Sequence, residues 1–345
     1  MEMTFFQVLW FFLIFLLIAG YFVLDGFDLG AGVLYPFVAK SERDKAVVRR
    51  SIGPVWDGNE VWLLTAGGAL FAAFPPAYAT TFSGFYLAVM LVLFGLIVRA
   101  VSVEFRGHDP QWARTWDACF FVGSLLPALL LGVAVGNIYA GIPMDAAGNY
   151  IGLPLIGLIT PFTLLTGLLG LAMFLAAGAT WIALKAPKPS ELQARAAKLR
   201  LPLQVVVLVL FAAVSLYGHF GIQPAMDPAL GVLRWVFALV FVAGIVVSLV
   251  LAKKKDCDKG AFVAQSASAV ALVGLLATSM FPNLVVASAG SIGPNITLMS
   301  AASSELSLMW MTIITCVGLP LVLVYHVIVY RTFRGRVSDD DLGHY

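Results

Sequence analysis

The sequence predicts an all-α membrane protein, a bundle of helices that crosses the bilayer many times. Hydrophobic residues make up 61% of the 345 residues and charged residues only 12%, against about 25% charged in an average soluble domain. A soluble domain of this length could not hide so much apolar surface. The apolar residues also form long continuous runs, unlike the alternating ten-residue segments of a membrane β-barrel. Together these observations exclude a soluble enzyme, a disordered chain and a disulfide-stapled scaffold.

The apolar runs predict nine membrane-spanning helices, since each crossing needs about 20 apolar residues. The first run is preceded by no basic segment and followed by no small-residue cleavage motif, so we expect a spanning helix there and no signal peptide. This run is unusually long, and its glycines predict that its last turns pack closely against other helices. The nine spans lie near residues 5–35, 56–74, 77–103, 115–138, 155–185, 201–221, 229–252, 261–281 and 307–330.

The basic residues support this number of spans. All of the 21 Lys and Arg residues except Arg234 fall on alternate loops and span ends; one of these loops carries the run 253–255. Because loops rich in Lys and Arg stay in the cytoplasm, we expect the N-terminus outside and the C-terminus in the cytoplasm. A wrong number of spans would have scattered the basic residues over both sides.

The connections between the spans are short, so no soluble domain is expected. Residues 187–200 predict an interfacial amphipathic helix. Segments 139–154 and 282–306 are rich in Gly, Ser, Asn and Pro, and they predict ordered caps over the bundle or contacts with a partner. We expect two parallel four-helix units, residues 1–138 and 155–281, with residues 307–330 as a ninth helix.

Six carboxyl side chains lie in or beside the first four spans, toward the cytoplasmic side. Ionisable groups in a bilayer are costly and mark functional sites. Such groups could be structural, pairing with arginines or capping helix ends. Because they outnumber the cations nearby, however, some of them should hold a proton, and a hydrated chain of such groups conducts protons. The six are Asp25 and Asp28, Asp57 and Glu60 (two pairs spaced i, i+3, each on one helix face), Glu104 and Asp117.

The chain shows no pattern for a metal or haem site. Cys119, Cys257 and Cys316 lack CxxC spacing and a neighbouring His, so we expect thiols that pack as small apolar groups. His219 and His326 fall in opposite halves of the bilayer in the predicted topology, so they cannot share one haem. The net charge of +2 gives no reason to expect binding to nucleic acid.

Three motifs carry a family resemblance: DGFDLG at 25–30, WDGNEVWLLTAGGALFAAFP at 56–75 and FSGFY at 82–86. With them, the chain resembles subunit II of the cytochrome bd-type quinol oxidases. The resemblance extends over essentially the whole chain. Further agreement comes from WD at 116–117, GVAVGN at 132–137, MFPN at 280–283 and AASS at 301–304.

The resemblance implies a role in respiration. The family's complexes oxidise quinol and reduce O2 to water in the plasma membranes of bacteria and archaea, with protons taken from the cytoplasm. Two b-type haems and one haem d belong to subunit I, so this chain is expected to bind no haem or metal and to have no catalytic residues of its own. It would support subunit I and supply a proton route. Other expected partners are membrane lipids, quinol and O2, and in some members a structural quinone; whether a small single-helix accessory subunit is present stays open.

The resemblance also suggests roles for single residues. The family's proton-path carboxylates match Asp28 and Asp57, and Glu104 where the family has Asp. The Trp near a lateral O2 path matches Trp62. Glu60 stands where some members have Gln, which adds an acid of open role. We expect Asp25, Glu60 and Asp117 at the mouth of the route or as charge partners.

The small residues at 26–32 and 65–73 further predict that spans one to three contact subunit I.

Two alternatives are kept. A proton-coupled membrane transporter would also place carboxylates in the membrane, but usually with a broken helix and a binding site near the midplane, whereas here the acids stop toward one face. A purely structural anchoring subunit would keep its function when the acids are removed.

Overall fold

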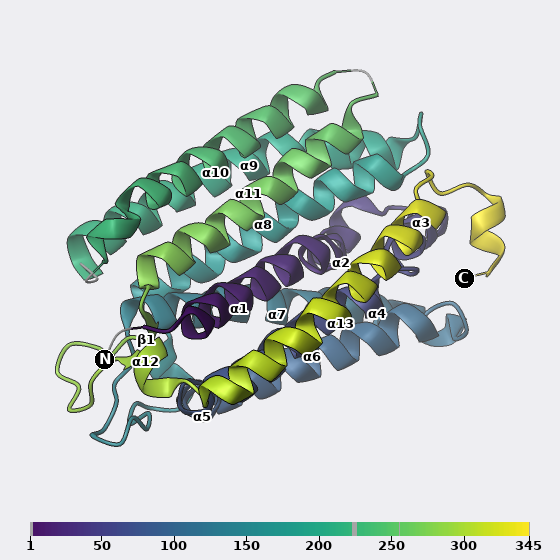
Figure 1. Cartoon of the computed structure of the whole chain (residues 1–345). Coiled ribbons are helices and arrows are strands. Elements are labelled where there is room, and N and C mark those ends of the chain that lie inside the picture. The colour runs from purple at the N-terminus through teal and green to yellow at the C-terminus, as the bar shows by residue number, and fades with distance from the viewer. Residues whose placement is uncertain (1–2, 223–225, 255, 345) are drawn as a thin grey trace.

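The computed structural model describes residues 3–222, 226–254 and 256–344, without the side chains of residues 343 and 344; Lys255 of the basic run 253–255 lies outside the described residues. The molecule is a set of long helices that run roughly side by side (Figure 1). Eight helical stretches in the described residues are long and apolar enough to cross a membrane. This confirms the expected all-α membrane architecture. The eight are Phe5–Val38, Tyr86–Phe105, Pro110–Ala140, Pro161–Lys185, Glu191–Ile222, Pro228–Ala252, Asp258–Met280 and Glu305–Thr332.

The first half of the chain forms one group of helices. The expected first span consists of two parts, α1 (Phe5–Leu24) and α2 (Gly26–Val38), joined at Asp25. Helix α1 packs against α4 (Trp56–Ala73), α2 packs against α7 (Ala113–Ala140), and α6 (Tyr86–Phe105) packs against α7. The shorter α3 (Glu42–Ile52) connects α2 to α4 at one end of the bundle.

The second half forms a neighbouring group, shown in teal and green in Figure 1. It contains α8 (Pro161–Lys185), α9 (Glu191–Tyr217), α10 (Gly231–Ala252) and α11 (Asp258–Met280). Helix α8 packs against α2 and α7, and α11 packs against α1, which joins the two groups. The last long helix, α13 (Glu305–Thr332), lies against α1 and α4, and Leu308 is its one buried residue.

The predicted span 77–103 is wrong at its start. The structure has two helices there, α5 (Pro75–Gly84) and α6, because the chain turns at Phe85. The two prolines that open α5 suit the first turn of a helix, where a missing N–H costs nothing. The predicted span 56–74 forms α4, but this helix is not one of the eight stretches above. The acidic and amide groups in its first two turns lower its hydropathy.

The predicted amphipathic helix at 187–200 is also wrong as a separate element. Residues from Glu191 onward are the first turns of α9, which continues without a break to Tyr217. The Ser190 hydroxyl accepts a hydrogen bond from the Gln193 N–H and so caps the start of this helix. Pro202 lies inside α9 without ending it. The polar start and the apolar body therefore belong to one helix.

The two segments expected to cap the bundle are ordered and contact each other. Strands β1 (Asn283–Val285) and β2 (Ile296–Thr297) pair antiparallel, and the short α12 (Leu298–Ala301) follows. The Ile142 N–H donates to the Val286 carbonyl at 3.0 Å, and the Ser288 N–H donates to the Ile142 carbonyl at 2.9 Å. The prediction of ordered caps is therefore confirmed for both segments.

Small residues bring α2 directly against its neighbours within the chain. A Cβ added to Gly30 would lie 1.8 Å from the carbonyl oxygen of Phe174, and one added to Gly32 would lie 2.0 Å from the Ser124 hydroxyl. The close packing predicted for the end of the first span is confirmed. The expectation that small residues at 26–32 face subunit I is wrong, because these glycines face α7 and α8 of the same chain.

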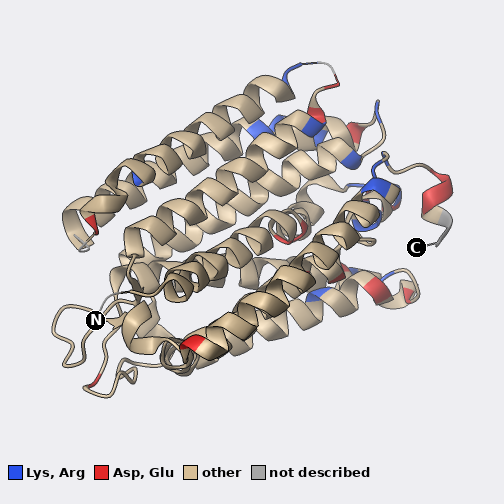
Figure 2. Ribbon diagram, viewed as in Figure 1, with Lys and Arg blue, Asp and Glu red and all other residues tan. Residues whose placement is uncertain are grey.

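The charged residues are distributed unevenly along the bundle. In Figure 2, Lys and Arg gather at the end that also holds the C-terminus, while the N-terminus lies at the other end. Arg234, in the first turns of α10, donates to the Thr278 carbonyl near the end of α11. The Lys and Arg residues that fall on alternate loops of the sequence thus gather at one end of the molecule.

Candidate functional site

A buried arginine joins two of the predicted carboxylates. Arg99 of α6 is 1% exposed, and its Nη2 lies 2.6 Å from Oδ1 of Asp25, which is itself fully buried. The same Nη2 forms an ion pair with Glu60 of α4. A buried charge is tolerated only when it is paired and hydrogen-bonded, so Arg99 holds these two acids together at the contact of three helices. We call Asp25, Glu60 and Arg99 the Arg99 cluster.

Asp28 belongs to a separate chain of hydrogen bonds beside this cluster. The amide Nδ2 of Asn59 donates to Oδ2 of Asp28 at 2.7 Å, and the hydroxyl of Tyr330 donates to Oδ1 of Asn59 at 3.0 Å. Asp28 and Asn59 are both fully buried. The chain therefore connects α2, α4 and α13 through polar atoms inside the protein.

Two carboxylate oxygens in this region have no partner among the described residues. They are Oδ2 of Asp25 and Oδ1 of Asp28, and both are buried. A buried acceptor without a hydrogen bond costs about 1–3 kcal/mol. A proton on the carboxyl or a bound water removes this cost, so the geometry suits groups that exchange protons.

Asp117 lies in a different environment, with two cations. Its carboxylate is 2.8 Å from Nζ of Lys45 and 3.0 Å from Nε of Arg106, and it accepts a hydrogen bond from the Tyr35 hydroxyl at 2.8 Å. Arg49 donates to the same hydroxyl at 2.9 Å. Charge compensation here is complete, which favours the structural interpretation for Asp117.

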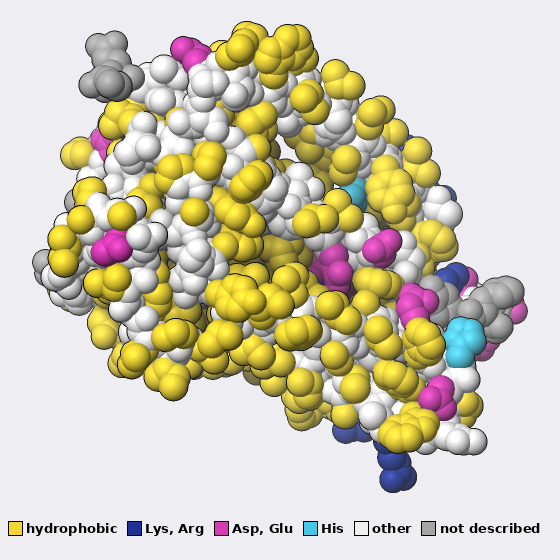
Figure 3. Space-filling model, turned by 90° about the horizontal axis from the view of Figure 1, so that it is seen from below, with side chains coloured by type: hydrophobic (Ala, Val, Ile, Leu, Met, Phe, Trp, Pro, Cys, Tyr) yellow, Lys and Arg dark blue, Asp and Glu magenta, His cyan; other side chains and the backbone are white. Residues whose placement is uncertain are grey.

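Asp57 and Glu104 lie on the surface of the chain. Both residues are exposed, and their carboxylates have no ion pair or hydrogen bond within the part of the chain that the structure describes. The lower face of the molecule, seen in Figure 3, is mostly hydrophobic, and acidic side chains lie beside a hollow in it. The structure thus separates the six predicted acids into a buried group, a compensated one and two exposed ones.

Trp62 is buried, and its indole N–H donates to Nε2 of His326 at 3.2 Å. The other ring nitrogen, Nδ1, lies 2.9 Å from the Val322 carbonyl. This pattern fits a neutral imidazole with its proton on Nδ1. Both nitrogens of His326 are therefore engaged within the chain.

Sequence reasoning missed Asn59, Tyr330 and the Trp62–His326 contact. Asn59 stands between two acids in the motif WDGNE, which was a usable signal. Tyr330 and His326 could not be linked to α4 from the sequence, because α13 lies far along the chain and meets α4 only in the folded bundle.

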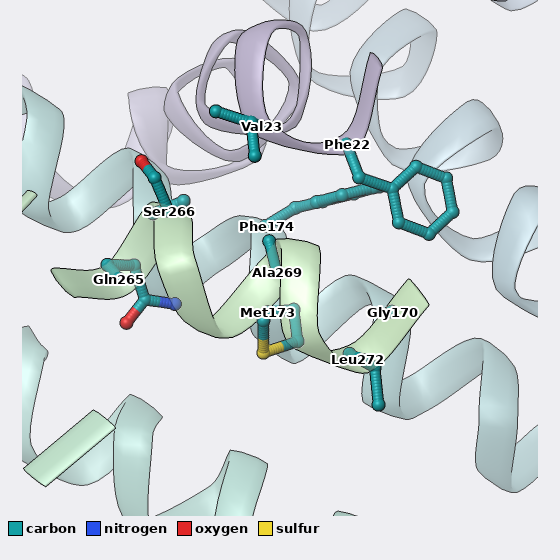
Figure 4. Close-up of a pocket in the computed structure, with 10 residues that line it drawn as sticks. Phe22, Val23, Gly170, Met173, Phe174, Gln265, Ser266, Ala269 and Leu272 are labelled. Carbon is teal, nitrogen blue, oxygen red and sulfur yellow. The ribbon is translucent and has the colours of Figure 1, made fainter. Parts of the chain in front are cut away.

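The described residues contain no group of three or more His, Cys, Asp and Glu side chains that could hold a metal ion. One apolar pocket lies between α1, α8 and α11, and its lining includes Phe22, Met173, Phe174, Gln265 and Ser266 (Figure 4). Its volume of about 20 Å³ is room for a single water molecule. The pocket as it stands is too small for an organic cofactor.

The whole chain is similar to known proteins. The family described as cytochrome bd terminal oxidase subunit II matches residues 6–333. A similar relative is the cytochrome bd-I ubiquinol oxidase subunit 2 of Escherichia coli K12, 33% identical over 368 residues, with 97% of this chain and 96% of that protein covered. The cytochrome bd ubiquinol oxidase subunit 2 of Bacillus subtilis is 36% identical over 335 residues, with 96% of each covered.

One solved structure also has this fold. It is a chain of the bd oxidase from Geobacillus thermodenitrificans, with a TM-score of 0.78 and 16% sequence identity. The alignment covers 96% of this chain and 99% of that one. At this identity the likeness concerns the fold alone.

Proposed function

The chain belongs to the cytochrome bd terminal oxidase subunit II family, and we propose that it carries protons from the cytoplasm toward the site of O2 reduction in its complex. As a family member it is a subunit of a bd-type quinol oxidase, a multi-pass protein of the bacterial inner membrane, and its partner is the oxidase subunit I. Reduction of O2 to water consumes protons, and a hydrocarbon interior supplies none. A dedicated route is therefore needed.

The observation that carries this proposal is the set of buried acids with free oxygens. Asp25 and Asp28 lie three residues apart at the α1–α2 junction and are fully buried, and each has a carboxylate oxygen without a hydrogen-bond partner among the described residues. A merely structural acid is expected to be fully paired, as Asp117 is. Glu60 extends the set toward the surface, because it is partly exposed while bonded to Arg99.

Asp57 and Glu104 complete the route at the surface. Their carboxylates have no partner within the described residues and are exposed, so we assign them to the boundary with subunit I. Asp25 and Glu60 act as charge partners of Arg99, and Asp117 anchors the basic end. The core of the route is then Asp28, Asp57 and Glu104.

The surrounding assembly is also part of the proposal. Two b-type haems and haem d lie in subunit I; this chain binds none of them, and its Trp62 lies near an O2 path. Quinol and O2 are the substrates of the complex, and lipids surround it. The exposed apolar sides of α13 and α4 suit a helical partner, since α13 has almost no buried face in the isolated chain.

The membrane topology is part of the proposal. We take α4 as a ninth crossing, because it is 18 residues long and packs against α1, even though its polar start lowers its hydropathy. The N-terminus is then outside and the basic end cytoplasmic. The four helical crossings before residue 140 and the four from α8 to α11 are the two units, and α13 is the additional helix.

The proposal is tested by O2 consumption with excess quinol, on purified complexes with full haem content. Asp28→Asn keeps the shape of the side chain but removes the titratable group, and we expect turnover to fall by more than about tenfold. Glu305→Gln, an exposed acid at the opposite end of the bundle, is the matched control and should turn over normally. Normal turnover in Asp28→Asn would leave the anchoring role as the better explanation.

A proton-coupled transporter is the less favoured function. The family match extends over nearly the whole chain, and no described feature calls for a transported solute.

A further inference from the structure

A cavity of about 150 Å³ lies at the basic end of the bundle, between α3, α8, α13 and the C-terminal tail. Liquid water occupies about 30 Å³ per molecule, so this space accommodates several waters. Its lining includes polar side chains from each element: Ser51 of α3, Lys185 of α8, Tyr330 of α13, and Arg336 and Asp341 of the tail. The lining suits water better than an apolar ligand.

The tail that covers this cavity is fixed in place. The Lys185 ammonium donates to the carbonyl oxygens of Phe333 and Gly335, and the Val337 N–H donates to the Lys185 carbonyl at 2.8 Å. Arg336 forms an ion pair with Asp258 of α11 at 2.8 Å. The cavity is therefore a built feature of the fold, held by contacts from α8 and α11.

Tyr330 connects the cavity to the buried acids. It lines the cavity, and its hydroxyl donates to Asn59, whose amide donates to Asp28. Two side chains therefore separate the cavity from a buried carboxylate whose Oδ1 has no hydrogen-bond partner among the described residues.

We propose that this cavity is the cytoplasmic proton vestibule of the chain and that Tyr330 is the positioning residue that links its water to Asp28. The inference rests on the proposed proton route and adds an entry point inside this chain, apart from the exposed Asp57 and Glu104. An excess proton from the cytoplasm enters the vestibule as a hydronium ion and ends on Oδ1 of the Asp28 carboxylate, which becomes a neutral carboxylic acid while the hydronium becomes water. Because the Asn59 amide does not pass on a proton, the transfer runs over water held beside the Tyr330 hydroxyl. The Tyr330 hydroxyl anchors the water next to Asn59 while this happens.

The first test asks whether water reaches the cavity. Ser51 lines it and is buried, so Ser51→Cys is a small change. The variant is made in a complex whose Cys119, Cys257 and Cys316 are replaced by Ser, and it is treated with a charged, water-soluble methanethiosulfonate. We expect labelling of the thiol and a fall in O2 consumption of about fivefold or more.

The matched control is Ser266→Cys in the same background. Ser266 lines the apolar pocket of Figure 4 and lies mid-helix in α11, where a charged reagent has no aqueous access. It should be neither labelled nor slowed. An unlabelled Ser51→Cys, or a labelled one with unchanged turnover, overturns the vestibule.

The second test concerns Tyr330 itself. Tyr330→Phe keeps the ring and removes the hydroxyl, and we expect about fivefold slower O2 consumption with an unchanged haem spectrum. The solvent deuterium isotope effect on turnover should rise, because proton delivery becomes limiting; a merely structural loss would not raise it. Tyr325→Phe is the control, an exposed tyrosine on the same helix.

The Asp28→Asn variant distinguishes a failure of the proton route from a failure of the vestibule alone. If Asp28→Asn turns over normally, the proton route itself is wrong. If Asp28→Asn is slow while Tyr330→Phe keeps the wild-type rate and isotope effect, the route stands and protons enter elsewhere.

Discussion

Arg99 and Asp25 are 74 positions apart in the chain, yet their guanidinium and carboxylate lie 2.6 Å apart in the buried interior. The same guanidinium also holds Glu60. One cation thus compensates two of the acids that the sequence places near the membrane, and Asp28 is left outside the pair. The stability of the buried Asp25 carboxylate therefore depends on Arg99.

Arg99→Met should destabilise the chain by about 3–5 kcal/mol, because it leaves a fully buried carboxylate without its cation. Thermal unfolding of the purified complex and the yield of assembled complex measure the effect. The double variant Arg99→Met with Asp25→Asn removes both charges and should recover part of the loss. Equal instability of the single and double variants would show that Arg99 acts through packing.

Asp57→Asn and Glu104→Gln should each slow O2 consumption by more than about tenfold, a barrier increase above about 1.4 kcal/mol, if both acids belong to the proton route. The haem spectrum should not change, since no haem ligand is touched. Both side chains are exposed in the isolated chain, so neither change should affect its folding. Near-normal rates in both variants would mean that protons travel only through the buried residues.

The variants Gly30→Ala and Gly68→Leu should both prevent assembly of the complex, but for different reasons. A Cβ at Gly30 would lie 1.8 Å from the Phe174 carbonyl oxygen, whereas at Gly68 nothing lies within 4 Å. Gly30→Ala should therefore prevent the chain from folding, and Gly68→Leu should fold but lose subunit I. Fluorescence-detected size exclusion of the chain, followed by co-purification of its partner, distinguishes the two. A Gly68→Leu chain that retains subunit I would move the interface away from this side of α4.

Replacing His219 and His326 by Ala should leave the haem content of the assembled oxidase unchanged. His326 already engages Trp62 and the Val322 carbonyl through its two nitrogens, so it has no free ligand atom. The optical spectrum of the reduced complex is the measurement. Loss of one haem species from a complex that still assembles would make this chain a haem ligand.

The loop around Asp145, which follows α7, should loosen in acid. Hydrogen bonds from the Asn149 side chain and backbone, and from Ala147, hold the pKa of Asp145 below its ordinary value of 3.8. A depressed pKa means that the stabilisation is present above the ordinary value and is lost as pH falls through the lower one. Hydrogen exchange at Asn149, compared with its intrinsic rate, should show protection that is constant above about pH 5 and falls in stronger acid. The Asp145→Asn variant should show no such dependence.

Much of the fold could be predicted from the sequence, since length and apolarity alone require helices in a bilayer. The errors in the predicted helix boundaries have local physical causes. The turn at Phe85 divided one expected span, and a capped polar start made residues 191–200 part of α9. The small residues at 26–32 were correctly associated with close packing, but periodicity could not tell whether the neighbour was α8 or another subunit.

The class of the protein, the basic end of the bundle and the six acids near it could all be predicted from the residues alone, because hydropathy and charge are properties of single residues and their spacing. Which acids are compensated depends on how the helices pack. Asp117 meets two cations, Asp25 and Glu60 share one, and Asp28 instead binds an amide that leads to Tyr330. Electrostatic energy depends on distances of a few ångströms between side chains, and helices far apart in the chain set those distances only when they pack.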